Sequence, residues 1–239
     1  MTLPTPRLVL FDVDFTLLEP GDMFEADGYR AIGERFGLAL DTSRWREAER
    51  AAFATVKRRR AEIGVAHDGG AYRAIADAII EALGGGPPDA VRACAEAIVA
   101  EWVRLENFAL YDDVLPCLAR LHEAGIRMGL VSNTSRDLDA IVAAFALADY
   151  VEVVVASIEI GLAKPSPAIF NAALERAGVL AADAVMVGDS VEDDVMGALA
   201  CGMGAVLLDR AARHDLPLPT VRTLADLPAM LGLVPPVPG

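Results

Sequence analysis

The stretch Leu8-Val9-Leu10-Phe11-Asp12-Val13-Asp14-Phe15-Thr16-Leu17-Leu18 holds an apolar run that ends in two acidic residues and a hydroxyl. The apolar residues at its start show no polar alternation, which is typical of a strand covered on both faces in a parallel sheet. Ionised carboxylates at the edge of a core are costly unless they meet a metal, a cation or backbone donors. Asp12 and Asp14 therefore indicate a site at the end of this strand. Because Asp also favours turns and helix starts, the stretch alone leaves ordinary turn chemistry as an equal alternative.

The composition describes an acidic globular protein. The chain has 239 residues, 54% of them hydrophobic, and a formal net charge of -14, so it lacks the basic footprint of proteins that bind nucleic acid or anionic membranes. Cys94, Cys117 and Cys201 are odd in number and have no CxxC spacing, which predicts neither a disulfide framework nor a zinc site. The first apolar run is broken by acids and fits neither a signal peptide nor a spanning helix. We expect a cytoplasmic protein.

Residues 19–106 are predicted to form a helical bundle. Their apolar residues recur with helical spacing in four groups, which are Tyr29, Ile32 and Phe36; Trp45, Ala48, Ala52 and Val56; Tyr72, Ile75, Ile79 and Leu83; and Val91, Cys94, Ile98, Trp102 and Leu105. The predicted joints are Gly37, Asp41 to Ser43, Asp68 to Gly70, and Gly84 to Pro88. No strand is expected in this segment.

From about Tyr111 onward, the pattern changes to alternating helices and strands. Apolar strand-like runs occupy 126–131, 151–155, 184–187 and 205–208, with helical patterns between them and a last short helix near 224–231. Pro165 is suited to the first turn of one of these helices. Such alternation predicts a parallel sheet with right-handed crossovers. The chain is therefore expected to divide into an α/β core of residues 1–18 and 107–239 and an inserted helical segment of residues 19–106.

Polar residues follow the predicted strands, where ligands bind in open α/β sheets. In chain order they are Asp12 and Asp14, Ser132, Lys164, and Asp189 with Asp193 and Asp194. Taken singly, Ser132 suits a helix cap, Lys164 a solvated surface, and the paired acids a helix N-terminus. Chance is a poor explanation for the joint occurrence of an acid, a hydroxyl, a cation and an acid after successive strands. We therefore expect these side chains to share one site.

This ordered set, Asp12-Val-Asp14-Phe-Thr16, Ser132, Lys164-Pro165 and Gly188-Asp189-Ser190-Val-Glu-Asp193-Asp194, resembles the haloacid dehalogenase-like hydrolase superfamily over residues 8–208. The insertion after the first motif resembles the superfamily's first cap type. The resemblance implies a Rossmann-like parallel sheet core with an inserted α-helical cap, of the phosphatase branch. Phe15 departs from the pattern, because many members have glycine or a small polar residue there.

The resemblance also implies roles that suit phosphoryl transfer, which mainly demands positioning and charge stabilisation. Asp12 would be the nucleophile that forms an aspartyl-phosphate, and Asp14 the general acid and base. Mg²⁺ would lie on the Asp12 carboxylate, the Asp14 backbone carbonyl and Asp189, with Asp194 or Asp193 holding a metal-bound water. The residues that would contact phosphate or offset its charge are Ser132, the backbone near Asn133, Lys164 and, through its hydroxyl, Thr16.

The leading interpretation is thus a Mg²⁺-dependent phosphatase acting on a small phosphorylated metabolite. A 2-haloacid dehalogenase and a phosphomutase of the same superfamily are alternatives; dehalogenases need neither the metal nor a second acid two residues after the nucleophile. From another class, a phospho-accepting signalling receiver uses similar residues but lacks the long insertion. The complete motif set agrees least with a binding protein that has no catalytic activity. The run Lys57 to Arg60 is read as a helix C-terminus, and His67, His122 and His214 show no ligand spacing. The expected partner is a small phosphate ester; neither the substrate nor the oligomeric state follows from the sequence.

Overall fold

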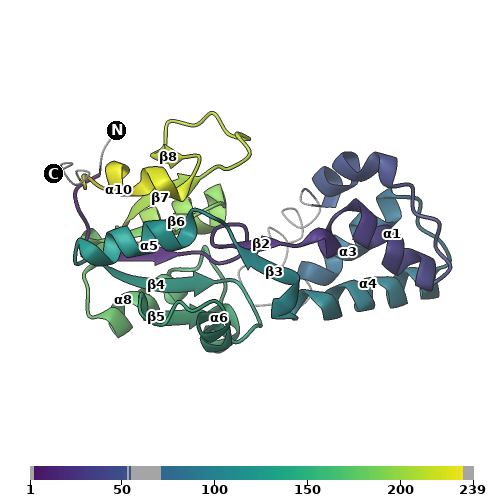
Figure 1. Ribbon diagram of the computed structural model, residues 1–239, viewed down its shortest axis with the longest axis horizontal. Coiled ribbons are helices and arrows are strands. Elements are labelled where there is room, and N and C mark those ends of the chain that lie inside the picture. The colour runs from purple at the N-terminus through teal and green to yellow at the C-terminus, as the bar shows by residue number, and fades with distance from the viewer. Residues whose placement is uncertain (1–2, 53, 55–70, 234–239) are drawn as a thin grey trace. The chain divides into compact units, whose positions relative to one another are not determined.

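The structure is a computed structural model that describes residues 3–52, 54 and 71–233. Its core is a six-stranded sheet with the strand order β5-β4-β1-β6-β7-β8, in which every neighbouring pair is parallel (Figure 1). The strands are β1 (Leu8–Phe11), β4 (Arg127–Ser132), β5 (Val151–Ala156), β6 (Ala184–Gly188), β7 (Gly204–Leu208) and β8 (Thr220–Val221). The predicted α/β core with a parallel sheet is confirmed, and β8 is a further strand that was not predicted.

Strand β1 lies in the middle of the sheet because its apolar run meets a neighbour on each side. Leu8 is in register with Arg127 of β4 and with Ala184 of β6, and every residue of β1 is buried. From β1 the chain fills the sheet outward through β4 and β5, and then returns to the other side of β1 with β6. The strand order therefore reverses between β1 and β6, which is where ligands bind in open α/β sheets.

Helices cover the two faces of this sheet. Those of the core are α5 (Val114–Glu123), α6 (Leu138–Ala144), α7 (Ser157–Ile160), α8 (Pro167–Ala177), the π-helix η5 (Val191–Met196), α9 (Gly197–Ala200) and α10 (Leu227–Met230), with short 3₁₀ turns at Ala181–Asp183 and Leu224–Asp226. The apolar side of α8 packs on the face that carries Leu8 and Leu10. Helices α5 and α10 lie side by side (Figure 1).

The prediction that Pro165 begins a helix is wrong. Helix α8 starts at Pro167, with Ser166 as the N-cap whose side chain accepts a hydrogen bond from the N–H of Ala168. Pro165 instead follows a cis peptide bond with Lys164, in the loop before the helix. A proline at the first helical position lacks an N–H that would have no partner there, and Pro167 serves that purpose.

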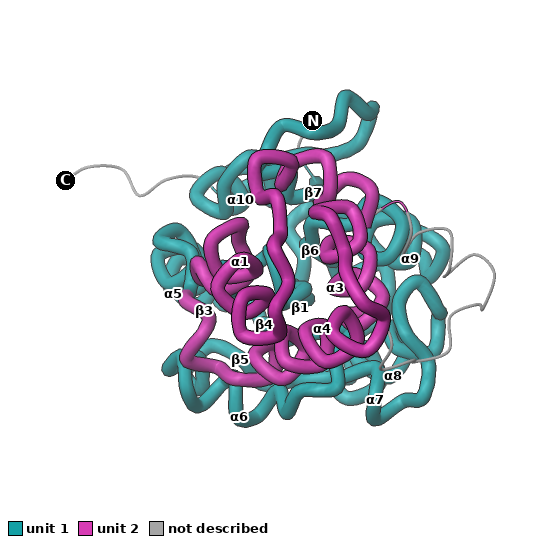
Figure 2. Tube along the Cα trace, turned by 90° about the vertical axis from the view of Figure 1, so that its right-hand side faces the viewer, with its two compact units in different colours: residues 1–19, 110–239 teal, residues 20–109 magenta. Residues whose placement is uncertain are grey.

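The chain divides into two compact units, residues 1–19 with 110–239 and residues 20–109 (Figure 2). The expected division was 1–18 with 107–239 and 19–106. In the second unit the structure has α1 (Ala26–Arg35), a helix over 45–52, α3 (Ala71–Ala82), α4 (Pro88–Trp102), and 3₁₀ turns at Asp22–Phe24, Thr42–Arg44 and Leu105–Asn107. Val56, the run Lys57 to Arg60, His67 and the joint at Asp68 to Gly70 lie outside the described residues.

A short strand at the unit boundary contradicts the expectation that residues 19–106 have none, because its last two residues fall in that segment. Strand β2 (Leu18–Pro20) pairs with β3 (Phe108–Leu110) in a two-stranded sheet, so the chain leaves and re-enters the core through paired strands. Beyond them, the backbone N–H of Gly21 donates to the carbonyl of Asn107 over 2.8 Å. Among the described residues, no helix has both the length and the apolar character needed to cross a membrane.

Candidate active site

Three carboxylates converge at the reversal point of the sheet. Asp12 follows β1, Asp189 follows β6, and Asp194 lies in the π-helix η5; each offers an oxygen within 4.8 Å of the others. The first two meet because β1 and β6 are parallel neighbours whose carboxyl ends lie together. A cluster of oxygen donors from acids is the ligand set that Mg²⁺ prefers. The donor chemistry of these residues therefore fits the expected metal.

Lys164 brings a cation into this cluster. Its buried ammonium nitrogen lies 2.6 Å from Oδ1 of Asp12, 2.6 Å from Oδ1 of Asp194 and 2.8 Å from the carbonyl oxygen of Val131. All three ammonium donors are thus engaged. Burial opposes the charge of Lys164, but the two carboxylates outweigh it and hold its pKa above the usual value. One ammonium among three carboxylates still leaves excess negative charge, which a divalent cation would offset.

The pKa values of the acids also indicate an excess of negative charge in the cluster. Burial, followed by repulsion from Asp12 and Asp194, raises the pKa of Asp189 well above its usual value. Burial raises the pKa of Asp194 to about 7, although Lys164 acts in the opposite direction. Carboxylates that are poorly stabilised as anions in this way are typical of functional sites.

Gly188 allows Asp194 to approach the end of β6. A Cβ atom at position 188 would lie 2.2 Å from Oδ2 of Asp194, a distance that no real structure accommodates. The same oxygen accepts the backbone N–H of Ser190 over 3.0 Å. Asp193 differs, since its backbone N–H donates to Oγ of Ser190 and its carboxylate is not part of the cluster. Of the two acids left open by the sequence, the structure places Asp194 beside Asp12 and Asp189.

Asp14 is held outside this cluster by a residue that the sequence did not point to. Its carboxylate forms an ion pair with Nη2 of Arg136, whose side chain is 3% exposed. The backbone N–H and Nε of Arg136 donate to Oγ1 of Thr134 over 3.0 and 3.3 Å, which turns the arginine inward. The only available signal was a basic residue four positions after Ser132, in the loop after β4.

Ser132 and Asn133 end β4 next to Lys164. Ser132 is buried at the last position of the strand. The side chain of Asn133 binds the backbone of Lys164 twice, donating from Nδ2 to its carbonyl over 3.1 Å and accepting its N–H on Oδ1 over 2.6 Å. The side chain of Asn133 therefore positions Lys164, and the phosphate contact expected near Asn133 concerns the backbone.

Thr16 is completely buried in the loop after β1. Its Oγ1 has no hydrogen-bond partner among the described residues and is closed to solvent, and the phosphate contact expected of this hydroxyl stays a prediction. Phe15, one residue earlier, adopts a φ of 62°, and its backbone N–H donates to the carbonyl of Leu18 over 2.8 Å. The left-handed region disfavours residues with a Cβ atom, which explains why glycine suits this position.

Comparison with known proteins agrees with this architecture. The family model described as haloacid dehalogenase-like hydrolase matches residues 6–202. A phosphoserine phosphatase of Thermus thermophilus is 37% identical over 147 residues, which are 61% of this chain and 57% of that protein. A ribulose-1,5-bisphosphate 5-phosphatase of Halopiger xanaduensis is 31% identical over 211 residues, which cover 87% of this chain and 86% of that protein.

A solved structure extends the similarity over nearly the whole chain. The 2-haloacid dehalogenase of Pseudomonas syringae superposes with a TM-score of 0.58 and 25% identity, covering 95% of this chain and 98% of its own. The relatives thus include both phosphatases and a dehalogenase. The match to the family model spans most of the chain, from before β1 to beyond α9. The chain is an enzyme and belongs to the haloacid dehalogenase-like hydrolase family.

Proposed function

We propose that this enzyme is a Mg²⁺-dependent phosphatase that hydrolyses a small phosphorylated metabolite through an aspartyl-phosphate on Asp12. The observation that carries the proposal is the cluster of Asp12, Asp189 and Asp194 around the ammonium of Lys164. When bound by these acids, Mg²⁺ would offset the charge of the incoming phosphate. Two relatives that carry phosphatase names support the reaction class.

In the first step, a carboxylate oxygen of Asp12 attacks phosphorus, and the bond between phosphorus and the ester oxygen breaks. Lys164 holds the Asp12 carboxylate in one orientation, so the attacking group is positioned before substrate arrives. The departing oxygen takes a proton from Asp14. In the second step, water gives a proton to Asp14 and attacks phosphorus, which releases inorganic phosphate and restores Asp12.

Asp14 suits the acid and base role because its carboxylate is separate from the acid cluster. Arg136 fixes this carboxylate, and the buried guanidinium is itself fixed by Thr134. The two acids after β1 thus have different partners: Asp12 faces an ammonium inside the cluster, and Asp14 a guanidinium outside it. Different partners are what separate roles require.

The inserted unit, residues 20–109, is proposed to act as a cap that selects substrates. Its insertion into the chain a few residues after β1 and Asp12 supports this role. A cap that excludes water would also protect the aspartyl-phosphate until Asp14 activates a water. Exchange of this segment for that of a relative is expected to change the ranking of substrates; an unchanged ranking would refute the cap's role.

The dehalogenase alternative is favoured by the similarity to the Pseudomonas syringae enzyme. Dehalogenation, however, needs neither a metal nor a second acid two residues after the nucleophile, whereas this chain has that second acid and three carboxylates that could hold a metal. A phosphomutase would use the same groups and differs in where the phosphoryl group goes. A panel of phosphorylated metabolites, tested with and without Mg²⁺ for release of inorganic phosphate, separates these activities. Metal-dependent phosphate release is expected; halide release from a 2-haloacid without metal, and no phosphate release, would refute the proposal.

A further inference from the structure

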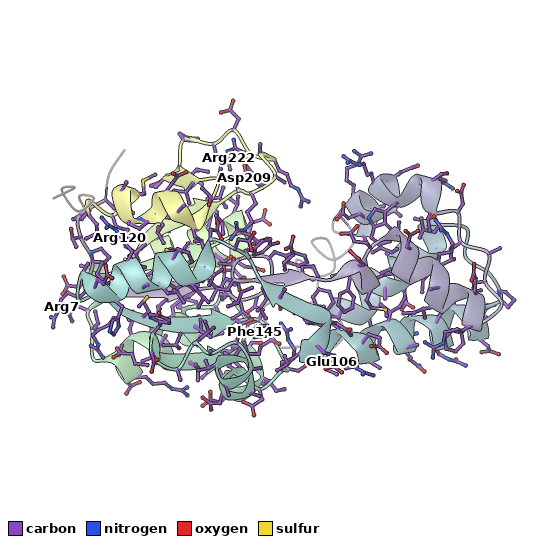
Figure 3. The ribbon with its side chains drawn as sticks, viewed as in Figure 1. Arg7, Glu106, Arg120, Phe145, Asp209 and Arg222 are labelled. Atoms are coloured by element: carbon purple, nitrogen blue, oxygen red, sulfur yellow. The ribbon has the colours of Figure 1, made fainter. Side chains whose placement is uncertain are left out.

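Arg210 occupies a fixed place just beyond the end of β7. The preceding residue, Asp209, closes the loop, because its carboxylate accepts the backbone N–H groups of Arg213 and His214, each over 2.9 Å. Nη1 of Arg222 donates to the same carboxylate over 3.1 Å (Figure 3). These contacts set the direction in which the chain leaves β7, and with it the position of Arg210.

The guanidinium of Arg210 contacts two separate pieces of the core, the segment 111–113 and the loop after β1. Nη1 and Nη2 form a bidentate ion pair with Asp113, over 2.8 and 2.9 Å. Nη2 also donates to the backbone carbonyl of Thr16 over 3.0 Å. The guanidinium carbon lies 3.8 Å from the centroid of the Tyr111 ring, which is a close stacking contact. Lysine could not reproduce this set, because it has neither the planar fork nor the flat face.

Asp113 is itself held rigidly. Its carboxylate accepts Oγ1 of Thr223 over 2.5 Å and the backbone N–H of Leu224 over 2.9 Å. Partial burial would raise the pKa of Asp113, but Arg210, Thr223 and Leu224 hold it below the usual value. The ion pair therefore ties Arg210 to a point that does not move with the loops.

Arg210 contacts residues close to both chain connections to the inserted unit. The chain leaves the core after residue 19 and returns at residue 110. Thr16 lies just before the exit and Tyr111 just after the return. The two segments are linked, because the backbone N–H of Tyr111 donates to the carbonyl of Leu17, the neighbour of Thr16, over 3.1 Å. The exit loop also holds Phe15 in the left-handed region, so it needs contacts that keep it in place.

We propose that Arg210 is a positioning residue that holds the loop after β1 and the residues that follow β3 in one arrangement, and so keeps Asp14 in reach of the ester oxygen that departs from phosphorus when Asp12 attacks. This inference rests on the roles proposed for Asp12 and Asp14. The competing explanation is an ion pair that only stabilises the core as a whole. The two explanations differ in which residues a substitution of Arg210 affects.

Hydrogen exchange of single amides distinguishes them. The N–H groups of Phe15, Leu17, Leu18 and Tyr111 all have backbone acceptors in this region. In Arg210→Met, these amides are expected to exchange at least about tenfold faster, while those of β5 keep their rates. Arg210→Lys keeps the charge and is expected to give a smaller change. Arg176→Met is the matched control and should leave these amides unchanged, since Arg176 likewise pairs with a carboxylate, that of Glu159, and donates to a backbone carbonyl, that of Val154.

Kinetics provide the second measurement. A small displacement of a reacting group costs up to about 10²-fold in rate, so Arg210→Met is expected to lower kcat by about 10- to 100-fold and leave KM within about twofold. Equal acceleration of exchange across the sheet, or unchanged exchange with unchanged kcat, would overturn the proposal. If the wild-type enzyme releases no phosphate but exchange still changes only at these amides, the proposed function fails and the anchoring role of Arg210 stands.

Discussion

Replacing Gly188 with alanine is expected to disrupt the acid cluster through one contact. The new Cβ would lie 2.2 Å from Oδ2, 2.3 Å from Cγ and 2.7 Å from Cβ of Asp194, so that side chain must move. Moving it breaks the hydrogen bonds to Lys164 and to the backbone N–H of Ser190, at 2.6 and 3.0 Å. Hydrogen bonds to charged groups contribute about 1.5–3 kcal/mol each. Gly188→Ala should therefore lower the free energy of unfolding by at least about 3 kcal/mol.

The assay must report on the core. Both tryptophans, Trp45 and Trp102, belong to the inserted unit, so intrinsic fluorescence follows that unit. Urea unfolding of the core is better followed by hydrogen exchange of the β6 and β7 amides, with far-ultraviolet circular dichroism as a second probe. The tryptophan transition then serves as an internal control for the inserted unit.

A double-mutant cycle identifies the cause of the loss. Asp194→Gly removes all three atoms that the new Cβ would strike, so Gly188→Ala should cost little more in that background. The expected coupling between the two positions is at least about 2 kcal/mol. If Gly188→Ala lowers stability equally with and without the side chain of Asp194, the reasoning from this contact is refuted.

Three further predictions concern charged groups. Asp14→Ala should slow transfer from an alkyl phosphate by about 10²–10⁴-fold more than transfer from p-nitrophenyl phosphate, because p-nitrophenolate leaves without a proton; equal slowing in stopped-flow assays would remove the acid role. Asp113→Asn should lower the free energy of unfolding most at neutral pH. The pKa of Asp113 is lower in the folded than in the unfolded state, so its carboxylate stabilises the fold above the unfolded-state pKa. The difference in unfolding free energy between wild type and variant should therefore shrink below about pH 4 in urea unfolding, and a constant difference would contradict this. Lys164→Met should lower the free energy of unfolding by about 3–5 kcal/mol, since Asp12 and Asp194 lose their cation. The loss should be smaller at pH 5 than at pH 8, because Asp194, with a pKa of about 7, takes up a proton. A loss that does not depend on pH in urea unfolding would argue against this charge balance.

The main strands were predictable because burial on both faces leaves a direct trace in the sequence. The run that begins at Leu8 has no polar alternation, and it is the fully buried central strand β1. Strands β2, β3 and β8 were missed because three, three and two residues are too few to show any period. Pro165 was misplaced because a second proline two residues later fits the helix start equally well.

The site was predictable as far as it depends on strand ends. Asp12 and Asp189 come together because parallel strands bring their carboxyl ends to one edge, and Lys164 joins them from the loop before α8. Arg136 and Arg210 escaped notice because the direction of a loop arginine is decided by contacts that no local pattern records. For Arg136, one such contact is the hydroxyl of Thr134, and for Arg210 it is a carboxylate 97 positions earlier in the chain.

The central claim, that the Asp12 carboxylate receives the phosphoryl group, can be tested by trapping the intermediate. Asp14→Ala protein should form the aspartyl-phosphate from p-nitrophenyl phosphate and hydrolyse it slowly, since the same side chain would activate water. After mixing with Mg²⁺ and the ester, acid quenching and peptide mass spectrometry should find one phosphoryl group on the peptide that contains Asp12, and none after Asp12→Asn is added. Continued nitrophenolate release with no phosphoryl group on Asp12 would contradict the claim.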